Sequence, residues 1–401
     1  MSVVTLEEFI ELLNEEQHID ITKLRNYARH GVHPEVRGEV WLYLLGVLSV
    51  DKSQEMTSVR SKFLEYESAN KRIPYLEKQI RAQVLRFYRQ RLAGGSGNSH
   101  RGMFTRDLQA RHLTSAPRRR TPQTIPSEPR LLPSTQFGLQ HMKMGAPIDD
   151  SRMLDEQRRF AQIIENVICA YINRHSQDTA ASQASGVCTD EQRAALQASV
   201  ESHMPRAYQW EPQAWVLYGD SMFDFHPSLV YLCAPFAHCM KAEAGVYFAF
   251  ERLMDMIQEY NVHNPLPQRV ASFLTLFRTT LPELHAYFEA EEVDLVAVAT
   301  SWLQHLLARE LQIDDVMRLW DTYFAVPDLL DLHVYVCLAI LTNCKDALEE
   351  FDRSETTSML FSLPPLDIDR VRTSFIISAA NQIISDAVNI RLSHEHDQMF
   401  E

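Results

Sequence analysis

The feature that most constrains the fold is the recurrence of apolar residues at helical spacing along most of residues 228–345. Apolar side chains three and four residues apart line one face of a helix, which is then buried. No alternating pattern of useful length predicts a strand, and only 12 of 401 residues are glycine, which argues against a turn-rich all-β fold. The sequence therefore predicts an all-α protein. The four clearest faces are Tyr247, Phe250, Leu253, Met254 and Ile257; Val270, Phe273, Leu274, Phe277 and Leu281; Leu295, Val298, Trp302 and Leu306; and Ile313, Val316, Met317, Trp320 and Phe324.

Helices are also expected outside this region. Thr5 and Glu8 form a capping-box pattern around the first of a series of apolar residues, which predicts a helix start. Further helices are expected within 31–48, with Pro34 near the first turn, and near 55–69, over 74–92, from 153 onward and over 366–388. The side chains expected in the core are Leu232, Phe236, Phe250, Trp302, Leu306, Trp320 and Phe324.

Composition separates a helical domain from its interruptions. Residues 93–150 begin with a Gly/Ser-rich stretch and continue rich in Pro, Ser, Thr and Arg, which buries too little apolar surface to offset the entropy of ordering. We interpret 93–150 as a disordered, basic, Pro-rich insertion between residues 1–92 and residues 151–390, which together form one domain. A low-complexity interruption is expected near 175–205, and residues 391–401 are a polar tail.

Charge and hydropathy argue against several classes of protein. The net charge is 39 − 53 = −14, whereas nucleic-acid binding needs a basic face. The longest apolar runs are too short to span a bilayer, and the acidic N-terminal segment lacks the basic start of a signal peptide. We therefore expect no nucleic-acid partner and no transmembrane segment, and a cytoplasmic location. The arginines at 118–120 of the insertion could recruit the protein to an anionic membrane, or simply be solvated in a linker.

No motif indicates a self-contained catalytic site. GGSG at 94–97 follows no strand and lacks the Lys-Ser/Thr of a phosphate-binding loop. The six cysteines form no C-x-x-C pair, HEH at 394–396 lies in the polar tail, and we expect no metal and no cofactor. No G-x-S-x-G supports a Ser-His-Asp triad, although the sequence does not exclude one. This pattern fits a protein that lends a residue to the active site of another protein and is not itself a hydrolase.

A series of short motifs occurs in order along the chain. GVHPEVRGEVW contains Arg37 and Trp41, and QIRAQVLR contains Ile80 and Arg86. LCAPF is followed by YFAFERLM, then by LPELHAYFE, and finally by ATSWLQHLLARELQIDDVMRLWDTYF at 299–324. Over roughly 24–92 and 153–390 the chain thereby resembles the TBC domain, a bilobed, all-helical domain that activates Rab GTPases. An unrelated helical scaffold would require the similarity of the last motif to be accidental.

The resemblance implies catalysis by two side chains inserted into a partner GTPase. In the family, an arginine from an I-x-x-D-x-x-R motif neutralises charge on the transferred phosphate, and this position is Arg86. The Asp of the motif corresponds to Gln83, which can form a hydrogen bond but not an ion pair. The alternative for Arg86 is a solvated helix arginine, one of several in a basic stretch with Arg81, Arg89 and Arg91.

The second catalytic residue of the family is a glutamine in a Y-x-Q-G-M motif, which orients the attacking water. Aligning the shared APF without a gap places Pro227 at the glutamine position and Tyr231 at a following Asp position. The glutamine is therefore absent, while the buried helix behind it remains and begins with a residue tolerated in a first turn. His226 or Asp224 could instead hold a water.

Two functions follow from the resemblance and stay open. The chain is either an activator that uses Arg86 and relies on the GTPase's own Gln, or a catalytically inactive module that binds a Rab GTPase or another partner as a scaffold in membrane trafficking. GTP and Mg²⁺ belong to the partner in either case. Arg37 and Trp41, one turn apart, are expected to be structural, as is Asp321.

Overall fold

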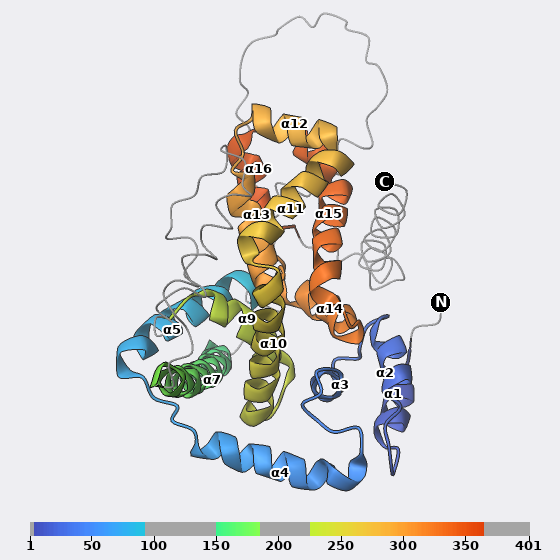
Figure 1. Ribbon diagram of the computed structural model, residues 1–401, viewed down its shortest axis with the longest axis vertical. Coiled ribbons are helices and arrows are strands. Elements are labelled where there is room, and N and C mark those ends of the chain that lie inside the picture. Colours follow the sequence, from blue (N-terminus) through green and yellow to red (C-terminus); the bar gives the residue numbers. More distant parts are fainter. Residues whose placement is uncertain (1–3, 93–149, 185–224, 365–401) are drawn as a thin grey trace, which may run out of the picture.

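The computed structural model describes residues 4–92, 150–184 and 225–364, and these ranges are helices joined by loops (Figure 1). The described ranges contain no strand, only an isolated bridge between His18 and Asp51. The prediction of an all-α fold is confirmed.

The helices are α1 (Leu6–Leu13), α2 (Ile21–Ala28), α3 (Arg37–Leu44), α4 (Lys52–Ser68), α5 (Pro74–Phe87), η1 (Tyr88–Leu92), α7 (Asp150–Ala184), α9 (Ser228–Cys239), α10 (Glu243–His263), α11 (Leu266–Thr280), α12 (Pro282–Ala290), α13 (Leu295–His305), α14 (Ile313–Ala325), α15 (Leu329–Leu348) and α16 (Arg353–Phe361).

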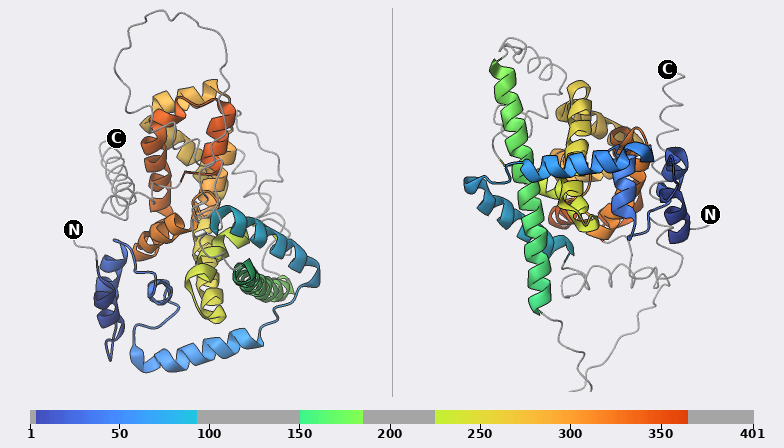
Figure 2. Two further views of the ribbon diagram at one scale, coloured as in Figure 1. Left: turned by 180° about the vertical axis from the view of Figure 1, so that it is seen from behind. Right: turned by 90° about the horizontal axis from the view of Figure 1, so that it is seen from below.

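The helices form an elongated body with two ends. Helices α11, α12, α15 and α16 gather at one end, and α3, α4, α5 and α7 gather at the other, with α9, α10 and α13 between them (Figures 1 and 2). Helix α11 packs on α13, α7 packs on both α5 and α9, and α14 packs on α2. Helix α5, which carries Arg86, also contacts α9, which follows Pro227. The fold therefore brings together two segments that are distant in the sequence.

Local sequence signals explain where several helices begin. The expected capping box is present at α1: the Glu8 amide donates to the Thr5 hydroxyl, and the Thr5 amide donates to the Glu8 carboxylate. Helix α16 starts with the same reciprocal pair, Asp352 and Glu355. Helix α5 starts with Pro74, whose fixed φ suits a first helical position and which has no N–H to leave unpaired.

The structure adds local detail at two predicted helices. Pro34 lies in a separate turn that the Val36 amide closes on the His33 carbonyl, and α3 follows it from Arg37. The helix predicted over 74–92 is present over that range, as α5 to Phe87 and then as the π-helix η1 to Leu92. In both places the hydrophobic pattern identifies the helix, while local backbone hydrogen bonding sets its limits.

The core is continuous and rich in aromatic side chains. Trp41, Phe236, Trp320 and Phe324 bring α3, α9 and α14 together, with ring centroids 5.0–6.2 Å apart. Aromatic pairs in such offset and edge-to-face arrangements add to the energy of burial. All seven side chains predicted for the core are buried: Leu232, Phe236, Phe250, Trp302, Leu306, Trp320 and Phe324.

Several expectations fall on parts of the chain that the structure does not describe. The predicted insertion at 93–150, except for its last residue, lies outside the described residues, as do the predicted helix at 366–388 and the polar tail at 391–401. The predicted interruption near 175–205 overlaps the end of α7, which continues to Ala184. The rest of that interruption also lies outside the described residues.

Candidate functional site

The Arg86 side chain is exposed near the carboxyl end of α5. It forms no hydrogen bond or ion pair with any residue in the described part of the chain, and the same holds for exposed Arg89. Arg81, in contrast, donates from Nε and Nη2 to the buried Glu165 carboxylate, at 2.8 and 2.9 Å. Of the arginines in this basic stretch, Arg86 and Arg89 are therefore available to a partner.

Arg91 is buried and anchors the end of this helical segment. It lies in the π-helix η1, and its guanidinium donates to the Phe361 carbonyl and the Ser362 hydroxyl, both at 3.2 Å. π-helical turns inside longer helices are frequently found at functional sites. Here the turn carries Arg91 away from solvent and against the residues at the end of α16, so α5 is held at its carboxyl end as well as along its length.

Pro227 caps the amino end of α9. It is exposed, with φ −55° and ψ −24°, and α9 begins at the next residue, as expected for a proline at a helix start. The Ser228 amide donates to Nδ1 of His226 at 3.2 Å, and the Leu229 amide donates to the His226 carbonyl. Burial lowers the pKa of His226. The residue expected in place of a glutamine thus has no side-chain hydrogen-bonding group.

Tyr231 joins α5 to α9. Nε2 of Gln83 donates to the Tyr231 hydroxyl at 2.8 Å, and the ring of Phe87 meets the Tyr231 ring edge-on at 5.9 Å. Arg86 lies between Gln83 and Phe87 in the sequence, and Pro227 precedes Tyr231 by four residues, which is about one helical turn of 5.4 Å. The two candidate catalytic positions therefore flank one contact between the two helices.

A buried polar network lies behind the start of α9. His305 Nδ1 donates to the Ser301 carbonyl at 2.7 Å, so its Nε2 accepts from the Ser228 hydroxyl, also at 2.7 Å. The Ser301 hydroxyl donates to the Glu310 carboxyl at 2.5 Å. Burial lowers the pKa of His305 to about 3 and raises the pKa of Glu310 to about 7. The network resembles a Ser-His-acid arrangement, but Ser228 is fully buried and no substrate can reach it.

Arg309 extends this network to Tyr231. Its guanidinium lies 5.9 Å from the Tyr231 ring centroid and 5.4 Å from that of Phe361, and it donates to the Ser301 hydroxyl at 3.0 Å. Arg309, His305 and Glu310 were not expected from the sequence. A signal that could have found them is the spacing of Ser301 and His305, four residues apart in a mainly apolar helix.

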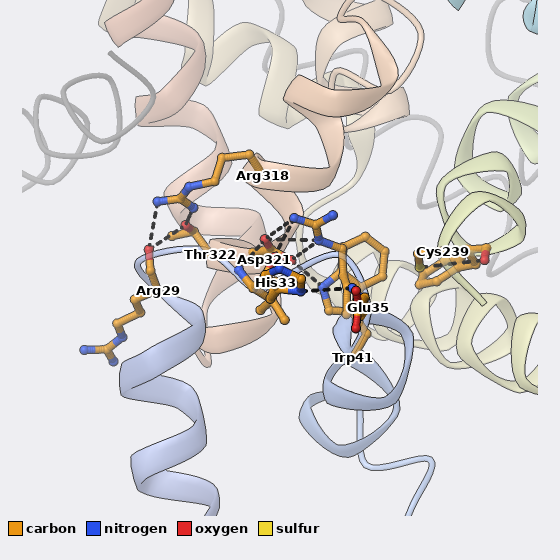
Figure 3. Close-up of polar contacts among 11 residues, drawn as sticks. Arg29, His33, Glu35, Trp41, Cys239, Arg318, Asp321 and Thr322 are labelled. Atoms are coloured by element: carbon orange, nitrogen blue, oxygen red, sulfur yellow. Dashed lines mark hydrogen bonds and ion pairs between the residues drawn. The ribbon is translucent and has the colours of Figure 1, made fainter. Parts of the chain in front are cut away.

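Arg37 and Trp41 bind one carboxylate (Figure 3). Asp321 accepts from Nε of Arg37 at 3.0 Å, from Nε1 of Trp41 at 2.8 Å and from the Val32 amide at 2.8 Å. Nη2 of Arg37 also donates to the Val32 carbonyl at 2.7 Å. Trp41 and Asp321 are fully buried, and the group ties α3 and the turn before it to α14, so these side chains hold the fold together.

Part of the chain is similar in sequence to a known family of domains. The family model described as the Rab-GTPase-TBC domain matches residues 219–349. The GTPase-activating protein gyp1 of Schizosaccharomyces pombe is 30% identical over 142 residues, which cover 34% of this chain and 28% of that protein. TBC1 domain family member 22A of Homo sapiens is 32% identical over 154 residues, which cover 37% of this chain and 30% of that protein. Residues 219–349 of this chain therefore carry the Rab-GTPase-TBC domain.

The TBC fold extends beyond the matched range. The crystal structure of the Ypt/Rab-GAP domain of Gyp1p superposes with a TM-score of 0.52 at 19% identity, covering 97% of this chain and 98% of that chain. At this identity the similarity concerns the fold alone. The range matched by the TBC family model includes Pro227 and helices α9 to α15, but not Arg86, and the matches span less than a third of the length of the two relatives above.

The described part of the chain contains no group of three or more His, Cys, Asp or Glu side chains able to hold a metal ion. Among the described helices, none is long and apolar enough to cross a membrane.

Proposed function

We propose that this chain accelerates GTP hydrolysis by a Rab-family small GTPase, with Arg86 inserted into the nucleotide site of the GTPase. The observation that carries the proposal is the availability of Arg86. It is exposed and unpaired among the described residues, whereas Arg81 and Arg91 of the same basic stretch are bound to Glu165 and to the end of α16. The match of residues 219–349 to the Rab-GTPase-TBC domain supports the class of partner.

The chemistry requires a fixed positive charge. During hydrolysis negative charge spreads over the oxygens of the transferred phosphoryl group, and a guanidinium placed beside them stabilises the transition state more than the bound GTP. Arginine keeps its charge at every relevant pH and offers several N–H donors in a planar fork. An arginine supplied in this way accelerates hydrolysis by about 10³–10⁵-fold. GTP and Mg²⁺ are contributed by the GTPase.

In this proposal the attacking water is oriented by the GTPase itself. The Pro227 side chain can neither donate nor accept a hydrogen bond, and neighbouring His226 already accepts the Ser228 amide at Nδ1. We therefore propose that the glutamine of the GTPase performs this role, while this chain supplies only the positive charge.

A second function is favoured by the same two departures from the family pattern. Pro227 occupies the glutamine position, and Gln83 occupies an acidic position while its amide is already bound to Tyr231. Arg86 therefore lacks the carboxylate that would orient it. A TBC module with this site could bind a Rab GTPase as a scaffold without accelerating hydrolysis.

Single-turnover GTP hydrolysis with a panel of purified Rab GTPases tests the proposal. The wild-type chain should stimulate at least one GTPase, and Arg86→Ala should abolish this stimulation without weakening binding of the GTP-loaded GTPase. Arg89→Ala is the matched control, because Arg89, three residues away, is also exposed and has no partner among the described residues, and it should retain stimulation. Undiminished stimulation by Arg86→Ala would contradict the proposal. Binding without stimulation by the wild type would support the scaffold function.

A further inference from the structure

Tyr231 is the point where several elements around the candidate site meet. Its side chain is only 9% exposed. It receives a hydrogen bond from Gln83 of α5, its ring packs edge-on against Phe87 of α5 and against His305 at the end of α13, and Arg309 lies over it. The chain has this tyrosine where the TBC pattern has an aspartate, so the contact is a feature of this chain.

Arg86 has no tie of its own to the described residues. Its guanidinium forms no hydrogen bond or ion pair there, so the place from which it extends is set only by the backbone of α5. The two residues of α5 that contact Tyr231, Gln83 and Phe87, lie three positions before and one position after Arg86. They fix the turn of α5 that carries Arg86 against the first turns of α9.

We infer that Tyr231 is a positioning residue for Arg86, whose hydroxyl, through Gln83, holds α5 in the register that hydrolysis requires. This inference rests on the proposed function. A displacement of about 1 Å at a reacting group can lower a rate on the order of a hundredfold, so a modest loosening of α5 is measurable. The ring contacts of Tyr231 with Phe87 and His305 do not need the hydroxyl, so they survive its removal.

Tyr231→Phe removes the hydroxyl and retains the ring. The matched control is Tyr66→Phe, because Tyr66 is also buried and donates one hydrogen bond, to Glu243, at a place between α4 and α10. Tyr231→Phe should lower the single-turnover rate constant at saturating concentration by about tenfold. The concentration that gives half the maximal rate should not change, and Tyr66→Phe should alter neither quantity. An unchanged rate constant for Tyr231→Phe, or an equal loss in both variants, would overturn the inference.

Amide hydrogen exchange in the free chain tests the positioning role of Tyr231 separately from the proposed stimulation of a GTPase by Arg86. The amides of α5 should exchange several-fold faster in Tyr231→Phe than in the wild type, and should be unaffected in Tyr66→Phe, because only the first substitution loosens α5. Unchanged protection of α5 in Tyr231→Phe would show that the hydroxyl does not hold the helix. If the wild type stimulates no GTPase, the proposed function fails. The exchange measurement then still decides whether Tyr231 fixes α5.

Discussion

Gly38 in α3 lies directly against the carbonyl oxygen of Cys239 at the end of α9: a Cβ atom on Gly38 would come within 2.9 Å of that oxygen. Real Cβ atoms do not approach a backbone oxygen so closely, so a side chain here would force α3 and α9 apart. The aromatic core between α3, α9 and α14 would be strained as a result.

Gly38→Ala should therefore destabilise the fold by about 1–3 kcal/mol, the usual range for overpacking. Gly245→Ala is the matched control, because its Cβ would meet only ordinary contacts, 3.7 Å from Leu42 and 3.8 Å from Met240. Gly245 is in the first turn of α10, where alanine is the better helix former, so this change should stabilise by up to about 1 kcal/mol. Urea denaturation of both variants measures the two effects, and equal shifts would refute the steric argument.

The Glu310 carboxyl should make stability fall as the pH rises. Its pKa is about 7 in the folded chain and near 4.5 when exposed, so between these values the folded state holds a proton that the unfolded state has lost. The free energy of unfolding therefore loses on the order of 3 kcal/mol across this window. His305, with its pKa lowered to about 3, acts in the opposite direction between pH 3 and 6.5.

Glu310→Gln isolates the contribution of the Glu310 carboxyl to the pH dependence of stability, because glutamine can still accept the Ser301 hydrogen bond but does not titrate. The stability of Glu310→Gln relative to the wild type should rise between pH 4.5 and 7 and then level off. Glu7→Gln, at an exposed position of α1, should give no comparable change. Denaturation at a series of pH values tests this, and a constant difference between Glu310→Gln and the wild type would contradict it.

Removal of the Asp321 carboxylate should strongly lower the free energy of unfolding. Asp321→Ala leaves Arg37, the Trp41 indole and the Val32 amide without their acceptor in a buried place. Breaking a buried pair in this way costs on the order of 3–5 kcal/mol. Arg353→Ala, which breaks an exposed ion pair with Glu292, should cost less than about 1 kcal/mol. Midpoints of urea denaturation give both values, and a mild effect of Asp321→Ala would show that the group is not an anchor.

Stimulation should depend on the glutamine of the GTPase. Because Pro227 cannot orient a water, a GTPase whose catalytic Gln is replaced by Leu should not be stimulated at all, even though it still binds. Single-turnover hydrolysis with the wild-type and substituted GTPase measures this dependence. Stimulation that survives the substitution would show that a residue of this chain orients the water.

The helices could be predicted because their apolar residues repeat at helical spacing, and burial of such faces determines the fold. The quoted motifs also led to the TBC family and to the position of Pro227 at the start of α9. Local backbone geometry was less predictable. The turn begun by His33 and the π-helix after Phe87 depend on backbone hydrogen bonds that the pattern of side chains does not specify.

The contacts that organise the candidate site could not be predicted. Gln83 and Tyr231 are 148 residues apart, and Ser228 and His305 are 77 residues apart, so only tertiary packing brings them together. In the sequence, Gln83 and Tyr231 are simply two departures from a family pattern. In the structure they compensate one another, since a neutral hydrogen bond joins the two positions where carboxylates were expected.

Arg91 fastens the chain at the limit of what the structure describes on this side of α5. The description stops at Leu92 and resumes at Asp150, and the hydrogen bonds of Arg91 to Phe361 and Ser362 lie between Arg86 and this limit. A pull on the chain from beyond residue 92 would therefore meet the Arg91 contacts before it reached α5. The direction of α5, and with it the reach of Arg86, is anchored from both sides: by Tyr231 before it and by Arg91 after it.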